Sequence, residues 1–207
     1  MNTNPFLLRI VILAIGTSLT GCLFRPATVT TRQFVLTPAR PASAPVTPTT
    51  LAVGLGAVKL PDYLLRNSLA VRKSELEIEY LENAVWAERL DQSFQRVLAL
   101  NLVDQLPGSR VQRSTWLPRE VALAAFVTVE RFDVDARGNG TLMANWRIET
   151  SDRRKVIKDG TTTLTKASTA PRNQPEDIAA TLSELNAQFS ETLAQAIREA
   201  AAHANAP

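Results

Sequence analysis

The stretch that decides the fold covers residues 121–166 and reads VALAAFVTVERFDVDARGNGTLMANWRIETSDRRKVIKDGTTTLTK. It contains runs in which apolar and β-branched residues dominate or alternate with polar ones, a pattern typical of strands. We predict strands at residues 121–134, 141–150 and 155–166. The intervening segments, 137–140 and 151–154, consist of Arg, Gly, Asn, Ser and Asp and are typical of hairpin connections. The stretch therefore predicts an antiparallel meander of long strands.

A long helix is predicted on each side of this meander in the sequence. Residues 86–106 place apolar side chains on one helical stripe, and Pro107 and Gly108 end the helix. The stripe consists of Leu90, Phe94, Val97, Leu98 and Leu102. The second helix begins at Pro175, and its stripe is Ile178, Leu182, Leu185, Phe189, Leu193 and Ile197. Because such stripes must be buried, we predict an α+β fold: a single domain with a mainly antiparallel sheet and two long amphipathic helices packed on it.

Shorter segments also predict strands. Residues 33–36 form a small strand candidate, residues 51–58 have a β-like composition, and residues 75–80 alternate strictly. The side chains expected on one face of the last segment are Leu76, Ile78 and Tyr80. Gly54 and Gly56 lack the third glycine and the following helix of a phosphate loop, so we predict a bulge or a close backbone approach there.

The amino terminus has the pattern of a bacterial export signal. Arg9 precedes a nearly continuous apolar run at 10–19, which is shorter than the roughly 20 residues that span a membrane. Residues 19–22 read Leu-Thr-Gly-Cys and resemble the lipobox, in which the cysteine becomes the acylated first residue of the mature chain. We therefore predict a signal peptide at 1–21 and attachment to a membrane through acyl chains, such as palmitate, on Cys22.

The residues after Cys22 suggest where the mature chain goes. Leu23 stands where Asp would resemble an inner-membrane retention signal, which favours the periplasmic face of the outer membrane in a host with two membranes. The expected organisation is a tether at 22–31, a domain at 32–203 and a disordered tail at 204–207. Residues 38–50 carry a proline every three or four positions and are either a spacer or a long surface loop.

Composition excludes several classes of site. The chain has one Cys and one His in 207 residues, and His203 lies in an Ala-rich end, so cysteine-rich zinc sites, redox pairs and histidine triads are not expected. The formal charge is only +3 and aromatic residues make up 6%, so no nucleic-acid partner is expected. Residues 133–138 resemble a calcium loop, but Arg137 occupies a ligand position and Ala144 the place of the bidentate Glu. We expect no metal, no cofactor and no enzymatic activity.

The order of short motifs is more informative than any single one. They are Lys59-Leu60-Pro61-Asp62-Tyr63, Trp86-Ala87-Glu88-Arg89-Leu90, Val129-Glu130-Arg131-Phe132 and Leu142-Met143-Ala144-Asn145-Trp146. This order resembles the PqiC family, the auxiliary lipoproteins of ABC-type and MCE transport systems, from Phe34 to the final helix. The chain departs from the family pattern at Leu65, where Asp is frequent, at Val85, where a basic residue is frequent, and at Arg89, where Pro is frequent.

The resemblance implies an outer-membrane lipoprotein that acts as a non-enzymatic auxiliary subunit. Its domain is expected to form a homo-oligomeric ring that receives the end of an MCE-protein tube, so that lipids cross the periplasm and membrane integrity is maintained. The candidate motif and interface residues are Leu60, Pro61, Asp62, Tyr63, Trp86, Glu88 and Trp146. Each of them is also explained by a place in a turn or in the core of the fold.

Two other functions stay open at this point. A periplasmic lipid carrier would line a pocket with the aromatic side chains of Tyr63, Trp86, Phe94 and Phe189. A hydrolase would need a pair of carboxylates. Those available to it are Glu88, Asp91, Asp133 and Asp135, and no spacing singles out a pair.

The lipobox gives a direct prediction. Replacing the acylated sulfur in Cys22→Ser removes the acceptor of the acyl chains, so the variant is expected to accumulate as an unlipidated precursor. Metabolic labelling with a radioactive fatty acid, followed by immunoprecipitation, measures this. Label in the variant at the wild-type level would show that Cys22 is not the acylated residue.

Overall fold

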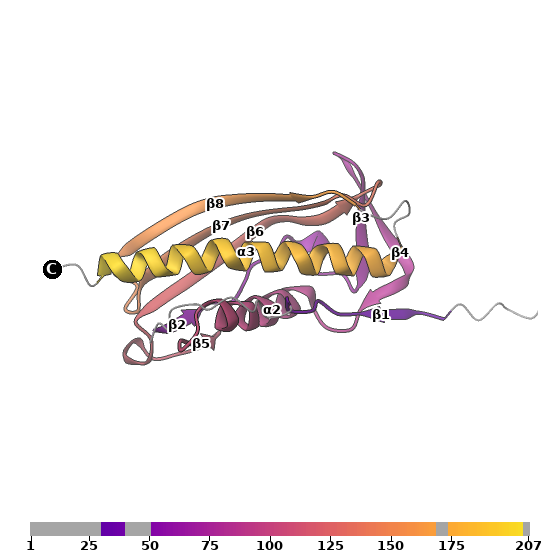
Figure 1. Cartoon of the computed structure of the whole chain (residues 1–207). Helices are drawn as coiled ribbons and strands as arrows, with labels where there is room; N and C mark the ends of the chain where they lie inside the picture. The colour runs from indigo at the N-terminus through magenta and orange to yellow at the C-terminus, as the bar shows by residue number, and fades with distance from the viewer. Residues whose placement is uncertain (1–29, 40–50, 169–173, 205–207) are drawn as a thin grey trace, which may run out of the picture. The chain divides into compact units, whose positions relative to one another are not determined.

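The computed structural model describes residues 30–39, 51–168 and 174–204 (Figure 1). The predicted signal peptide, Cys22 and residues 40–50 of the proline-rich segment lie outside the described residues. Residues 31–207 make one compact unit, which is the unit described below. None of the helices in the described part of the chain is long and apolar enough to span a membrane.

The centre of this unit is the meander of long strands. The strands are β1 (Arg32–Phe34), β2 (Ala52–Leu55), β3 (Ser68–Ser74), β4 (Glu77–Trp86), β5 (Arg110–Arg113), β6 (Leu123–Asp135), β7 (Gly140–Thr150) and β8 (Val156–Lys166). The β6, β7 and β8 strands pair antiparallel in sequence order, which confirms the predicted meander. Cross-strand pairs such as Phe126 with Arg147 fix the register.

β7 lies along one edge of β6, and two short strands, β2 and β3, share the other edge. The first residues of β6 pair in parallel with β2, which in turn pairs with β5. The last residues, Val134 and Asp135, pair in parallel with β3, and β4 and β1 continue from there. With 13 residues, β6 is long enough to hold both groups of strands. The α+β single domain is as predicted, but its sheet is mixed: among the described strands the long pairings are antiparallel and several short ones are parallel.

Both long helices lie on the same face of the β6–β8 meander (Figure 1). They are α2 (Leu90–Gln105) and α3 (Pro175–Ala204), and two short 3₁₀ turns, η1 (Asp62–Leu64) and η2 (Pro118–Glu120), complete the unit. All residues of the two predicted apolar stripes are buried. Phe94 joins the layers, because its ring meets Phe132 edge-on at 5.0 Å and Phe189 at 6.2 Å between centroids.

The prediction that Trp86 opens the first helix is wrong. Trp86 is the last residue of β4, and the helix begins at Leu90. The strand continues this far because Ala84, Val85 and Trp86 pair with β1, and the Trp86 amide donates to the Asn67 carbonyl. Local helix propensity is overridden by this long-range pairing.

The hairpin that joins β3 and β4 also differs from the alternation predicted for residues 75–80. Leu76 lies in the turn, not on the strand face with Ile78 and Tyr80, and is 99% exposed.

The close approach expected at Gly54 and Gly56 is present, but the groups that approach these glycines are aromatic side chains and not backbone. A Cβ on Gly54 would lie 2.4 Å from the Trp116 ring and one on Gly56 2.6 Å from the Phe126 ring.

The contact of Phe94 with both layers gives a stability prediction. Phe94→Ala removes a fully buried ring and leaves a cavity, so we expect a loss of about 3–5 kcal/mol in the free energy of unfolding. Urea denaturation followed by tryptophan fluorescence measures it. The control Leu76→Ala, at a fully solvated position, is expected to change the same quantity by less than about 0.5 kcal/mol. Equal effects of the two variants would contradict this description of the core.

Candidate functional site

The first family motif lies at the turn that leads into the β3–β4 hairpin. Pro61 precedes η1, and its carbonyl accepts a hydrogen bond from the Leu64 amide at 3.0 Å. Leu60 packs partly buried against the core, whereas the Asp62 side chain is exposed. This turn aims the Tyr63 side chain at the end of β6.

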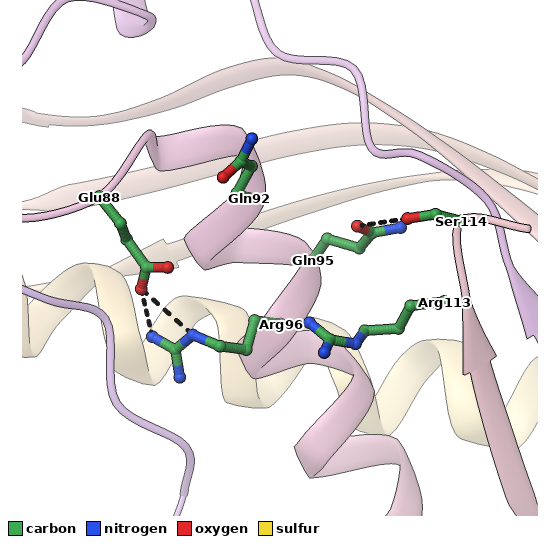
Figure 2. A pocket seen from close by; sticks show the side chains of 6 residues that line it. All are labelled: Glu88, Gln92, Gln95, Arg96, Arg113 and Ser114. Carbon is green, nitrogen blue, oxygen red and sulfur yellow. Dashed lines mark hydrogen bonds and ion pairs between the residues drawn. The ribbon is translucent and has the colours of Figure 1, made fainter.

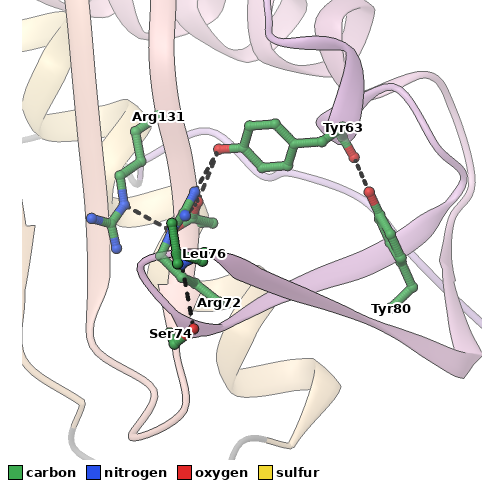
Figure 3. Close-up of polar contacts among 7 residues, drawn as sticks. Tyr63, Arg72, Ser74, Leu76, Tyr80 and Arg131 are labelled. Atoms are coloured by element: carbon green, nitrogen blue, oxygen red, sulfur yellow. Dashed lines mark hydrogen bonds and ion pairs between the residues drawn. The ribbon is translucent and has the colours of Figure 1, made fainter.

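The Tyr63 hydroxyl points toward Arg72 (Figure 3), and both side chains bind one buried carboxylate. The Asp133 side chain is fully buried and accepts hydrogen bonds from the Tyr63 hydroxyl at 2.9 Å, from Arg72 Nη2 at 2.7 Å and from Arg131 Nε at 2.9 Å. β3 supplies Arg72, and Arg131 reaches Asp133 from two residues earlier on β6. We call Tyr63, Arg72, Arg131 and Asp133 the Asp133 cluster. With this many donors bound, the carboxylate oxygens have few acceptor positions left for a further hydrogen bond.

The Asp133 cluster favours the protonated form of two of its members, Tyr63 and Arg72. Burial, followed by the negative charge of Asp133, raises the pKa of Tyr63 from 10.0 to about 12. The hydrogen bond to Asp133 raises the pKa of Arg72 above its usual value. At neutral pH Tyr63 therefore stays a protonated donor and Arg72 a cation. The arrangement suits a structural clamp, because a general base needs a pKa near the working pH.

The two predicted tryptophans are packed in the interior. The Trp86 side chain is 6% exposed and that of Trp146 is 9% exposed. Trp146 Nε1 donates to Thr162 Oγ1 at 2.9 Å, and its ring lies over Gly160, where a Cβ would come within 2.7 Å. Packing in the interior therefore accounts for both tryptophans of the motifs.

The aromatic residues of the proposed lipid pocket do not surround a cavity together. Phe94 and Phe189 are fully buried and in contact, Trp86 belongs to the same core, and the Tyr63 hydroxyl is bonded to Asp133. These side chains fill the interior that a lipid chain would have to occupy.

Glu88 marks a different feature, a polar cleft of about 530 Å³ beside the first turns of α2 (Figure 2). We call it the arginine cleft; its lining residues are Glu88, Gln92, Gln95, Arg96, Arg113 and Ser114. The Arg96 guanidinium donates to Glu88 Oε1 from Nε at 3.1 Å, and this hydrogen bond lowers the pKa of Glu88. The Arg113 side chain, at the end of β5, makes no hydrogen bond or ion pair among the described residues, although its charge also contributes to lowering the pKa of Glu88.

The floor of the arginine cleft is fixed by Gln95. This side chain is 8% exposed and donates from Nε2 to the Gly56 carbonyl at 2.8 Å, while its Oε1 accepts from the Ser114 hydroxyl at 3.3 Å. Ser114 adopts a positive φ of 70°, a conformation that costs a non-glycine residue free energy. The cleft therefore offers a fixed wall and a free guanidinium, the group that pairs best with carboxylates or phosphates.

The sequence predicted only some of the residues of the Asp133 cluster and of the arginine cleft. Tyr63 and Asp133, singled out for different reasons, are brought together, whereas Trp86, Trp146 and Glu88 lie apart from them. Arg72, Arg96, Arg113 and Arg131 were missed. Only the Arg131-x-Asp133 spacing within a strand carried a signal, since alternate residues share a face. No group of three or more His, Cys, Asp and Glu side chains within the described ranges is placed to hold a metal ion.

Comparison with known proteins adds a family and a fold. Residues 34–194 match the family described as the ABC-type transport auxiliary lipoprotein component. A stretch of 51 residues is 39% identical to the intermembrane transport lipoprotein PqiC of Escherichia coli (strain K12); it covers 25% of this chain and 27% of that protein. The chain thus spans about a quarter of the length of this curated relative.

Two crystal structures share the fold. A protein from Xanthomonas campestris has a TM-score of 0.70 at 16% identity, over 83% of this chain and 97% of the other. An uncharacterized protein has a TM-score of 0.68 at 23% identity, over 81% of this chain and 99% of the other. Because both identities are low, the likeness concerns the fold alone.

The raised pKa of Tyr63 predicts a pH dependence of stability. Because the folded-state pKa of about 12 lies above the ordinary value of 10.0, the stabilisation is complete below pH 10 and is lost as the pH rises from 10 to 12. Tyr63→Phe is expected to flatten this decline and to lower the free energy of unfolding at pH 7 by about 1–2 kcal/mol. Urea denaturation at several pH values measures both; an unchanged slope in the variant would show that Tyr63 does not titrate in this way.

Proposed function

We propose, on the premise that this chain belongs to the ABC-type transport auxiliary lipoprotein family, that it is a non-enzymatic adaptor of an MCE-type lipid transport system. In this proposal acyl chains on Cys22 hold it on the periplasmic face of the outer membrane. Copies form a ring that receives the end of an MCE-protein tube, so that lipids cross the periplasm and membrane integrity is preserved. Residues 22–31 are the tether, and residues 32–203 are the domain that makes contact.

The proposal rests on one observation: the Asp133 carboxylate is surrounded by hydrogen-bond donors of its own chain. It is the most deeply buried carboxylate among the described residues, and Tyr63, Arg72 and Arg131 all donate to it. A hydrolase would need a carboxylate that can exchange a proton with substrate. Glu88 is likewise paired, with Arg96. Asp91 pairs with Arg89, and Asp135 accepts a hydrogen bond from Asn139. The four acids that the sequence suggested for catalysis are thus each bonded within the chain, which supports a role in contact.

The arginine cleft is the proposed contact for the MCE protein. It is open to solvent on α2 and β5. The Arg113 guanidinium makes no ion pair among the described residues, because Glu88, the carboxylate on which its charge acts, is bonded to Arg96. A guanidinium that stands on a rigid wall gives orientation and specificity to an acidic side chain of a partner. We therefore propose that an Asp or Glu of the MCE protein binds Arg113.

This proposal is tested by co-purification from detergent-solubilised membranes that contain the full-length lipoprotein and its MCE protein. Wild-type chain is expected to retain the MCE protein, and Arg113→Glu to retain at least about tenfold less, because reversal of a paired charge costs more than 1.4 kcal/mol. Arg137→Glu, the same change at an exposed turn between β6 and β7, is the control and is expected to retain the wild-type amount.

Two results would contradict the proposal. Equal retention by Arg113→Glu and wild type would exclude the arginine cleft as the contact. Absence of the MCE protein from wild-type preparations that carry bound phospholipid instead would favour the carrier function.

A further inference from the structure

The tip of the β3–β4 hairpin presents an apolar side chain between acids. Leu76 is 99% exposed, and its amide donates to Ser74 Oγ at 3.3 Å (Figure 3). Glu75 and Glu77 flank it and make no ion pair among the described residues, since Lys73 pairs with Glu79 at 2.7 Å. Leu76 is thus fully solvated and lies between two carboxylates that form no ion pair among the described residues, although the charge of Glu77 acts on Lys73. We call residues 74–77 the hairpin tip.

The hairpin tip is not loosely placed. Arg72, two residues before the tip, is tied to the buried Asp133 by Nε at 3.1 Å and Nη2 at 2.7 Å. The Tyr80 hydroxyl on the returning strand donates to the Tyr63 carbonyl at 3.0 Å. The base of the hairpin is therefore clamped on both strands, which lowers the conformational entropy lost when the tip binds something.

The face of the meander that the helices leave uncovered carries a surface of aromatic and basic side chains, in contrast to the acids of the hairpin tip. Phe126 and Arg147 form a cross-strand pair there, with the Arg147 guanidinium carbon 5.0 Å from the centroid of the Phe126 ring. The guanidinium carbon of Arg153 lies 4.8 Å from the same centroid, and the Trp116 ring follows at 6.4 Å. We call Trp116, Phe126, Arg147 and Arg153 the aromatic platform.

A cavity and several basic side chains lie at the aromatic platform. A cavity of about 260 Å³ adjoins it, and Phe126 and Trp146 line this cavity together with polar side chains, among them Asp159. Arg147 pairs with Glu149, and Arg154, whose side chain is 86% exposed, pairs with Asp152, whereas Arg153 makes no ion pair among the described residues. The platform thus offers an aromatic ring beside the unpaired guanidinium of Arg153 and the solvated guanidinium of Arg154, to which a leucine between two carboxylates is complementary.

Tip and platform of one chain cannot meet. The platform lies near Phe126, at the beginning of β6, whereas the tip extends beyond Asp135, at its end. The intervening nine residues of extended strand measure about 30 Å. Complementary surfaces that are held this far apart on one rigid domain can be joined only between molecules, and such head-to-tail contacts close into rings when the rotation permits.

We propose that the hairpin tip of one copy docks on the aromatic platform of the next copy, with Leu76 in the recess beside Phe126 and Glu75 and Glu77 on the guanidinium groups. This inference rests on the proposed ring-forming function and adds to it the surfaces that meet. It is independent of the arginine cleft, because Arg113 pairs with Leu55 and shares its helix-facing side, opposite to Phe126.

A charge-reversal pair tests the docking with the full-length chain in detergent, using native mass spectrometry to read the oligomer. The tip variant carries Glu75→Lys and Glu77→Lys, and the platform variant carries Arg153→Glu and Arg154→Glu. Each alone is expected to raise the dissociation constant for self-association at least about tenfold. An equimolar mixture is expected to assemble again with alternating copies, because every reversed tip then faces a reversed platform. Leu76→Ser is expected to weaken assembly by about tenfold or more, since burial of the leucine is lost.

The matched control carries Asp104→Lys and Glu191→Lys, the same charge change on exposed positions of α2 and α3, and is expected to assemble like wild type. Variants that assemble like wild type, or a mixture that stays dissociated, would overturn the docking of tip on platform. A wild-type chain that is monomeric would overturn it as well. The proposed transport function is read separately, by retention of the MCE protein, so either proposal can fail without the other.

Discussion

The arrangement of this domain depends on one buried carboxylate, that of Asp133, which accepts hydrogen bonds from three side chains. Asp133 stands near the end of β6, and its donors come from three places: Tyr63 in the first family motif, Arg72 in β3 and Arg131 in β6 itself. Removal of one partner from such a buried ion pair costs about 3–5 kcal/mol. The parallel joint between β3 and β6 extends over few residues, so the carboxylate supplies much of what orients the hairpin.

Two of the donors that surround the carboxylate are also held in one protonation state at neutral pH. A catalytic acid or base must change its protonation during turnover, whereas Tyr63 and Arg72 have their pKa values moved away from neutrality by Asp133 and by burial. The motif that resembles the family is thereby accounted for in physical terms. Leu60 and Pro61 shape the turn, and Tyr63 closes the contact. Our proposals therefore place the contacts of the domain on its free surfaces.

The sequence predicted what depends on local periodicity. The three strands of the meander and the buried stripes of α2 and α3 follow from patterns of two and of about 3.6 residues, and their ends agree to within a few positions. It did not predict the parallel edges of β6, because those pairings join segments that are far apart in the chain. Trp86 was misplaced for the same reason: its partner strand β1 begins 54 positions earlier, at Arg32. The arginines of the two candidate contacts, such as Arg113 and Arg153, had no periodic signal at all.

The surfaces that we propose as contacts between copies lie at different places on the domain. The helices cover one face of the meander, the aromatic platform lies on the other, and the hairpin tip projects beyond Asp135. The central claim is that the domain works by contact between copies through these surfaces. A photo-crosslinking amino acid at position 76 of the full-length chain, irradiated in living cells, tests it most directly. The account predicts an adduct of twice the chain mass whose crosslinked peptide contains Phe126 or Arg153 of a second copy; an adduct without this chain as partner, or none, would contradict it.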